Sequence, residues 1–379
     1  MKNKKRDINK FIPIEIIFPI ILLLVFTIKG FKQPFYWDTK EFLVGGSIAI
    51  FDQHSLFAYT RATDYPHTPI IPLITGTLIK LSEKLNQNPY LTIHIFSFFV
   101  SCLFLLLVYH WGFFFTNNKI GSIILCLLFA TNPLFLSQSI LWYFEIPGSL
   151  LKYLALLFLF KKKYKYFTIT AIIAFLVRLE NGPFLFLSSL IFLPLQSKQN
   201  KTKYFINYSL PIFLVSIAWI LVHYLYTKWW FYSPNRYFNE NPIQTLNQLK
   251  FYLLRFQDRN ILSLTTIVIF LFTFKYKKLS TQQRLTNIVL LMAVIYPIII
   301  ITKLGYFLPR YTFSILPIYY LIISKNLTNL LKKHKILSLS LAVILLLFQL
   351  KNLYNSYSGN HEDSLQVIET INETQKNNQ

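Results

Sequence analysis

Charged residues are scarce in this chain. Only 14% of its 379 residues are charged, and aspartate and glutamate together number 15. A soluble domain carries about 25% charged residues, because most of its surface faces water. The deficit argues against a water-soluble protein, and the hydrophobic content of 54% favours a chain surrounded by lipid.

Cysteine clusters and nucleotide-binding motifs are also missing. Cys102 and Cys126 both lie inside apolar runs, where they suit packing, and no Cys/His group has zinc-site spacing. The chain contains no Walker-type loop, no Gly-x-Gly-x-x-Gly and no Gly-x-Ser-x-Gly. These absences argue against nucleotide-driven chemistry and serine hydrolysis. An enzyme of this kind must take an activated substrate from the membrane itself.

Apolar runs extend from one end of the chain to the other. Because a helical span needs about 20 apolar residues, they predict an all-α polytopic membrane protein with about eleven transmembrane helices in one domain, 1–379. The first run lacks a small-residue cleavage site, which favours an uncleaved span over a signal peptide. The spans are expected near 11–30, 91–115, 120–139, 144–160, a hairpin within 167–197, 204–225, 261–274, 285–302, 311–324 and 336–350.

Three longer polar stretches interrupt or follow these runs. The threading places 31–90 and 226–260 outside the membrane as first and second external segments, and 351–379 outside as a polar tail. Within the first external segment, 42–51 suits a helix lying in the interface. Three prolines, at 66, 69 and 72, then fix the backbone on entry to another apolar helix.

Basic residues account for the net charge of +23, and they lie in short clusters between the apolar runs. This distribution follows the positive-inside rule and argues against nucleic-acid binding. It predicts a cytoplasmic N-terminus and an external C-terminus. The richness in Lys, Asn and Ile suggests an AT-rich genome, so we expect a bacterial cytoplasmic (inner) membrane.

The first external segment holds several candidate site residues. Asp38 follows the first span directly and lies beside Trp37, with Glu41 close behind. A partly desolvated carboxylate there is a candidate general base, although spacing alone favours a solvated interfacial loop. Asp64 and His67 come next. His67 could bind a metal, move a proton or bind a phosphate, or it could simply cap a helix at the interface.

Ionisable residues inside apolar runs form a second group of candidates. Each costs about 2.5–3.5 kcal/mol at the bilayer centre, so Arg178 and Glu180 need a reason to be there. They either pair with each other or shape a polar cavity. Glu145, at the external mouth of another span, is either a cavity carboxylate or a surface group that snorkels to water.

A third group lies near 303–311. Arg310 follows Pro309 and precedes Tyr311, so it could present a rigid guanidinium to a phosphate. Anchoring of the interface by Tyr and Arg is the alternative. Lys303 and Arg236 could supplement the positive charge.

In chain order, these segments resemble the glycosyltransferases of the C fold (GT-C), which use polyprenyl-phosphate sugars. Protein O-mannosyltransferases and lipid A aminoarabinose transferases are examples. Asp38 is similar to the acid that follows the first span in that family. The other similar segments are His67-Thr68-Pro69 with Pro72-Leu73, Asn132-Pro133-Leu134 before Glu145, Arg178-Leu179-Glu180-Asn181-Gly182, and Pro309-Arg310-Tyr311 with Leu316-Pro317.

The resemblance implies transfer of a sugar from a polyprenyl-phosphate carrier to a lipid, glycan or protein acceptor on the external face, with inversion. Asp38 would be the base, and Arg310, Arg178 and Lys303 would bind the donor phosphate. Some relatives use a divalent metal ion, for which Asp38, Asp64 and His67 are the candidate ligands; no other cofactor is implied. The remaining cavity and acceptor residues would be Glu41, Asp64, His67, Glu145, Glu180 and Tyr311.

Transport is the alternative function. A transporter or flippase of a lipid-linked sugar or another solute predicts ionisable residues along one path and, preferably, repeated halves. No internal repeat is found, and the ionisable residues gather near the external side, which favours an enzyme. A sugar polymerase or ligase of the same broad fold also remains open.

Overall fold

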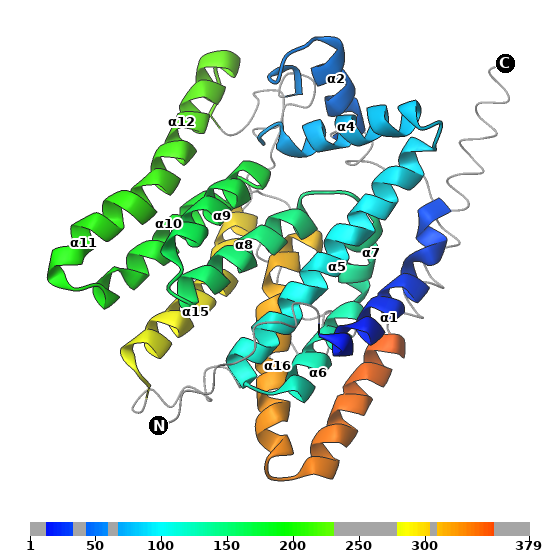
Figure 1. Cartoon of the computed structure of the whole chain (residues 1–379), viewed down its shortest axis with the longest axis vertical. Coiled ribbons are helices and arrows are strands. Elements are labelled where there is room, and N and C mark those ends of the chain that lie inside the picture. Colours follow the sequence, from blue (N-terminus) through cyan, green and yellow to red (C-terminus); the bar gives the residue numbers. More distant parts are fainter. Residues whose placement is uncertain (1–12, 33–42, 60–66, 231–278, 304–308, 352–379) are drawn as a thin grey trace.

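The computed structural model describes residues 13–32, 43–59, 67–230, 279–303 and 309–351, and these residues form helices joined by turns, without a strand (Figure 1). The expected all-α fold is therefore confirmed for this part of the chain. The predicted span 261–274, most of the second external segment and the tail from 352 lie outside the described residues, as do 33–42 and 60–66 of the first external segment.

The helices begin and end close to the boundaries expected from the apolar runs. The N-terminal half contains η1 Ile14–Ile16, α1 Ile17–Thr27, η2 Ile28–Lys32, α2 Gly46–Asp52, α4 Ile70–Lys84, α5 Pro89–Thr116, α6 Lys119–Ala130, α7 Pro133–Ile140 and α8 Glu145–Phe160. The remainder contains α9 Tyr164–Val177, α10 Asn181–Phe192, η4 Leu193–Leu195, α11 Lys198–Tyr204, the π-helical turn η5 Phe205–Ser209, α12 Leu210–Thr227, α15 Thr281–Lys303, η7 Pro309–Ile315, α16 Leu316–Leu331 and a helix over 335–351.

Four helical stretches among the described residues are long and apolar enough to cross a membrane, and a bent pair makes a possible fifth. Other helices are shorter: α8 has 16 residues, α9 has 14 and α10 has 12. At 1.5 Å per residue even α8 is about 24 Å long, less than the roughly 30 Å hydrocarbon core. The chain thus has the helices of a membrane protein, while the count of eleven crossings stays a prediction. The four stretches are Ile14–Phe31, Pro89–Thr116, Lys198–Thr227 and Thr281–Ile300.

The predicted span 120–139 is broken into α6 and α7, which meet at an angle of 68°. Pro133 has no N–H and cannot continue α6, so a new helix starts there. Asn132 caps it, because its Oδ1 accepts a hydrogen bond from the Phe135 N–H at 3.1 Å. The other end of the same amide donates to Tyr320 Oη at 2.7 Å, which fixes the bend against α16.

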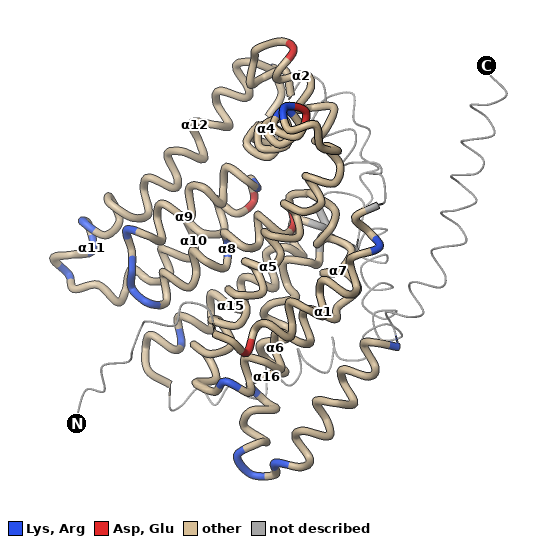
Figure 2. The backbone as a smooth tube through the Cα atoms, turned by 45° about the vertical axis from the view of Figure 1, so that its right-hand side comes forward, with Lys and Arg blue, Asp and Glu red and all other residues tan. Residues whose placement is uncertain are grey.

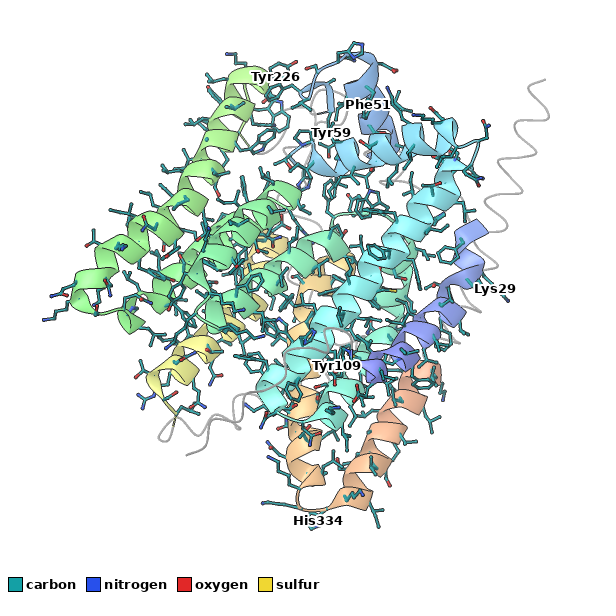
Figure 3. All side chains as sticks on the ribbon, in the orientation of Figure 1. Lys29, Phe51, Tyr59, Tyr109, Tyr226 and His334 are labelled. Carbon is teal, nitrogen blue, oxygen red and sulfur yellow. The ribbon has the colours of Figure 1, made fainter. Side chains whose placement is uncertain are left out.

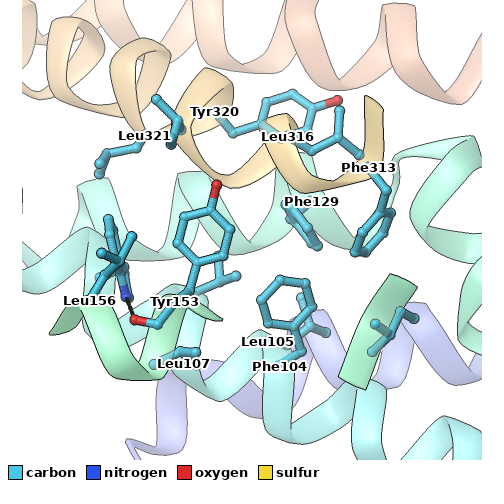
Figure 4. Close-up of a cluster of buried hydrophobic side chains, with 14 of the residues drawn as sticks. Phe104, Leu105, Leu107, Phe129, Tyr153, Leu156, Phe313, Leu316, Tyr320 and Leu321 are labelled. Atoms are coloured by element: carbon cyan, nitrogen blue, oxygen red, sulfur yellow. Dashed lines mark hydrogen bonds between the residues drawn. The ribbon is translucent and has the colours of Figure 1, made fainter. Parts of the chain in front are cut away.

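An aromatic cluster fills the centre of the bundle (Figure 4). Phe104 of α5 meets Phe129 of α6 edge-on at 5.4 Å, and Phe129 lies 4.6 Å from Phe135 of α7. Phe313 of η7 stacks on Phe135 at 6.3 Å. Each such pair contributes about 0.5–1.5 kcal/mol beyond its buried area. The cluster therefore holds η7 firmly in the core, which matters for the site described below.

Close helix contacts surround α6 because glycines face its neighbours. Gly121 accepts a hydrogen bond on its carbonyl from Ser324 Oγ of α16 at 2.5 Å. A Cβ at Gly121 would lie 2.3 Å from Thr328 Oγ1, and a Cβ at Gly112 of α5 would lie 2.9 Å from Ser122 Cα. Small residues of this kind let helix backbones approach each other in membranes.

We expect Gly112→Ala to lower the thermal stability of the protein in detergent more than Gly121→Ala does. Both changes gain the same helix propensity, about 1 kcal/mol. A methyl group at 112 meets backbone, which cannot rotate away, whereas at 121 it meets the ends of hydroxyl side chains. Thermal unfolding curves of the two variants measure the difference. A Gly112→Ala protein as stable as Gly121→Ala would contradict the close α5–α6 contact.

Many basic residues lie in the turns between helices, and several helices expose apolar side chains. Figure 2 shows many of the Lys and Arg along the lower and left edge, at the turn between α8 and α9, at α11 and after α16. Others lie on α4, at the opposite end. The Lys119 and Glu15 side chains pair at 2.6 Å. Large apolar side chains are exposed along α1, α12 and the helix over 335–351, which suits contact with lipid.

The segment after α2 packs against the far end of α12. The Phe57 ring stacks on Tyr226 at 4.4 Å and lies 6.2 Å from Trp219. Figure 3 labels Tyr226, Tyr59 and Phe51 in this region, between the tops of α12 and α4. α4 runs crosswise over the end of α5 (Figure 1).

Candidate functional site

The structure describes four of the predicted site residues in full: His67, Glu145, Arg178 and Glu180. For three others, at the end of α15 and the start of η7, only the backbone lies within the described part; these are Lys303, Arg310 and Tyr311. The last three lie outside the described residues and are Asp38, Glu41 and Asp64.

The turn between α9 and α10 presents Arg178 and Glu180. α9 ends at Val177, and Arg178 is extended, with φ −148° and ψ 113°. Its Nε donates to Oε1 of Glu180, and the two side chains are only 13% and 27% exposed. Of the two interpretations, pairing with each other is the one that these contacts show, and a polar cavity around the pair stays a prediction. Asn181 Nδ2 ties the turn down by donating to the carbonyls of Gly148 at 3.0 Å and Ala174 at 3.2 Å.

The Pro-rich entry to α4 rests on this same end of the bundle. Thr68 Oγ1 donates to the carbonyl of Leu176, in the last turn of α9. Trp142 Nε1, just before α8, donates to Thr75 Oγ1 of α4 at 2.9 Å. These two bonds hold α4 over the beginning of α8 and the end of α9.

His67 thereby lies against the start of α8. Its ring stacks on Phe144 with centroids 4.5 Å apart, and Phe144 directly precedes Glu145. No group of three or more His, Cys, Asp and Glu that could hold a metal occurs among the described residues. The predicted metal site depends on Asp38 and Asp64, which lie outside them.

Glu145 is the first residue of α8 and is 1% exposed. A surface group that snorkels to water is therefore the wrong interpretation, because protein covers this carboxylate. The N-terminus of a helix carries partial positive charge, which favours a negative charge at that position. The alternative interpretation, a cavity carboxylate, agrees with this burial and stays a prediction.

Gly148 explains how closely these segments meet. It lies one turn after Glu145 on α8, and a Cβ there would lie 3.1 Å from both Cβ and Cδ of Arg178. The absence of a side chain at Gly148 lets the α9–α10 turn approach α8 closely. We call the resulting group the polar cluster; it consists of His67, Glu145, Arg178 and Glu180.

Lys152 is a functional candidate that the sequence interpretation missed. It lies in the middle of α8 and is 4% exposed. Its Nζ donates to the carbonyl of Ser314 in η7 at 3.3 Å and lies 5.5 Å from the ring centre of Phe184. The same argument that singled out Arg178, the cost of a charge inside an apolar run, would have found it.

No family model, curated protein or solved structure matches this chain. The fold and the polar cluster therefore define a class and not a family: an α-helical protein with helices able to span a membrane and a buried group of ionisable residues. Chemically, the cluster combines a guanidinium, an imidazole and two carboxylates. Such a set can hold an anionic group and move a proton.

Proposed function

We propose that the chain is a membrane glycosyltransferase of the C-fold type. It would move a sugar from a polyprenyl-phosphate carrier to a lipid, glycan or protein acceptor on the external face. One observation carries the proposal. At the start of α8, His67 stacks on Phe144, directly before Glu145, and Arg178, which pairs with Glu180, lies against Gly148 of the same helix. Ionisable groups are costly in an apolar bundle, so their convergence indicates a common use.

The mechanism is a single displacement. Asp38 takes the proton of an acceptor hydroxyl or amine, and the acceptor atom attacks the anomeric carbon. The bond between that carbon and the phosphate oxygen breaks, so the configuration inverts. The phosphate leaves with the bonding electrons, and its charge is stabilised by Arg310 together with Arg178 or Lys303. A divalent metal held by Asp38, Asp64 and His67 would supply further positive charge.

The proposal also includes the topology of the chain in the membrane and its binding partners. About eleven helices cross a bacterial inner membrane, with the N-terminus inside and the C-terminus outside. The membrane lipids, the lipid-linked donor and the acceptor are the partners. The basic turns at α8–α9, α11 and the end of α16 lie at the end of the molecule away from α4, which supports this orientation.

Transport of a lipid-linked sugar or another solute is the second candidate, and one observation favours it. Lys152 follows Glu145 by seven residues on α8, so it extends the ionisable groups about 10 Å along the helix. Charged residues along one path through the membrane are typical of transporters.

Mass spectrometry of envelope glycolipids and glycoproteins separates these candidates. We would compare cells with the wild-type protein, with Asp38→Asn and without the protein, at equal membrane levels. The proposal predicts that one species loses a single sugar mass in both the Asp38→Asn and the deletion cells, because the base is required for attack. A change in the deletion cells alone would remove Asp38 from its role. An unchanged profile in both would favour transport.

A further inference from the structure

Lys152 and its neighbour hold one backbone carbonyl between them. Lys152 Nζ donates to the carbonyl of Ser314 at 3.3 Å, and Tyr153 Oη donates to the same oxygen at 2.6 Å. All three residues are buried, with Lys152 4% exposed and Tyr153 1% exposed. The proposed mechanism uses none of them. Burying a charged amine is unfavourable, so we looked for a role of the Lys152 bond to this carbonyl.

The carbonyl is available because of the sequence that follows it. η7 is a 3₁₀ helix that ends at Ile315, and α16 starts with Leu316-Pro317. Continuing the 3₁₀ pattern would pair the Ser314 carbonyl with the N–H of residue 317. Proline has no N–H, so this partner is missing. Burying an unpaired carbonyl is unfavourable, and the two side chains of α8 supply the bonds.

The carbonyl lies in the element that begins with Pro309-Arg310. Phe313 fixes the same element in the aromatic cluster, with its ring 5.9 Å from Phe104. On α8, Gly148 and Lys152 are four residues apart and therefore share a face. A Cβ at Gly148 would lie 3.1 Å from Arg178, while Lys152 donates to the Ser314 carbonyl of η7. One face of α8 thus sets the spacing between the Arg178 turn and η7.

We propose that Lys152 is a positioning residue: through its bond to the Ser314 carbonyl it fixes η7, the element that begins with Pro309-Arg310, against α8. This rests on the proposed function, which assigns both arginines to the donor phosphate. Lys152 touches neither donor nor acceptor in this arrangement. It acts by holding the element that carries Arg310.

A thiol placed at the held residue tests the link without any assay of transfer. In the full-length Ser314→Cys protein in detergent, N-ethylmaleimide labelling at position 314 is measured by mass spectrometry, with the fully buried native Cys126 as internal reference. We expect Lys152→Met to raise the rate at 314 severalfold, because only the Tyr153 bond to the Ser314 carbonyl then remains. Lys152→Arg and the exposed control Lys165→Met should label at the parent rate. An unchanged rate in Lys152→Met would overturn the proposal.

A second variant decides the matter if Lys152→Met also makes Cys126 reactive. Pro317→Ala supplies the missing N–H to the Ser314 carbonyl. The double variant Lys152→Met/Pro317→Ala should then label as slowly as the parent at both thiols. If Lys152→Met acts instead by removing the packing of the lysine side chain, a change at position 317 should not reduce the labelling. A double variant as reactive as Lys152→Met would refute the link.

The rate of sugar transfer is the second measurement that tests the positioning role of Lys152. Lys152→Met should lower kcat about 100-fold, the effect of a misplaced catalytic group, with little change in the KM for the acceptor. Lys152→Arg should keep a kcat close to that of the wild-type protein. Protection of residue 314 by Lys152 with transfer unaffected by Lys152→Met would exclude the positioning role. If no transfer is found even with the wild-type protein, the proposed function fails, and the labelling result still decides whether Lys152 holds η7.

Discussion

Arg178→Met is expected to reduce sugar transfer about 100-fold or more, the usual effect of losing one charge-stabilising donor from an active site. It should also destabilise the protein by about 3 kcal/mol, because Glu180 is left with its charge partly buried. The two side chains are 13% and 27% exposed, so water can replace only part of the lost interaction. Thermal unfolding and the envelope glycolipid profile measure the two effects separately.

The double variant Arg178→Met/Glu180→Gln separates stability from function. Removing both charges should recover most of the stability, since no unpaired ion stays buried, while transfer stays low because the guanidinium is still missing. Arg284→Met, at an exposed arginine of α15, is the matched control and should change neither property. Recovery of transfer in the double variant would show that Arg178 serves only to neutralise Glu180.

Glu145→Gln is expected to lower transfer about 100-fold, the effect of a misplaced acceptor, because Glu145 is assigned to the cavity that binds it. The substitution keeps the shape of the side chain and removes a charge that protein covers almost completely. Stability should fall by less than about 1 kcal/mol, the contribution of an acid at a helix N-terminus. The measurement is the rate of sugar transfer at equal membrane levels.

Glu83→Gln is the control for this second effect. Glu83 lies on α4, the helix that rests over the start of α8, but it is exposed. The same replacement of a carboxylate by an amide at Glu83 should leave the rate of sugar transfer unchanged. Equal activity of the Glu145→Gln and Glu83→Gln proteins would remove Glu145 from the site and leave it as a helix-terminal charge.

The helices themselves could be predicted well, because their signals are local. Apolar runs and prolines placed α5 at Pro89–Thr116 and α8 at Glu145–Phe160 within a few residues of expectation. The break at Arg178 to Glu180 was also expected, because ionisable residues interrupt an otherwise apolar run. The bend at Asn132-Pro133 was missed, although a proline after an N-cap residue signals a new helix.

The site could be predicted only in pieces. A charged residue within an apolar run can be recognised from the sequence, because its burial is costly. Arg178 was found in this way, and Lys152 could have been. Whether Glu145 reaches the surface depends on which helices cover it, and that depends on packing between segments far apart in the chain. For Lys152, the partner is a carbonyl whose availability follows from Pro317, more than 150 positions further along the chain.

The sequence by itself determined that the chain is helical and apolar enough to lie in a membrane, with basic turns at one end, because composition and run length decide those properties locally. The tertiary structure alone decided that His67 stacks on Phe144, that Gly148 lets Arg178 rest on α8, and that Lys152 holds η7. These contacts depend on the crossing of helices and on which glycines allow close approach, so no local pattern contains them.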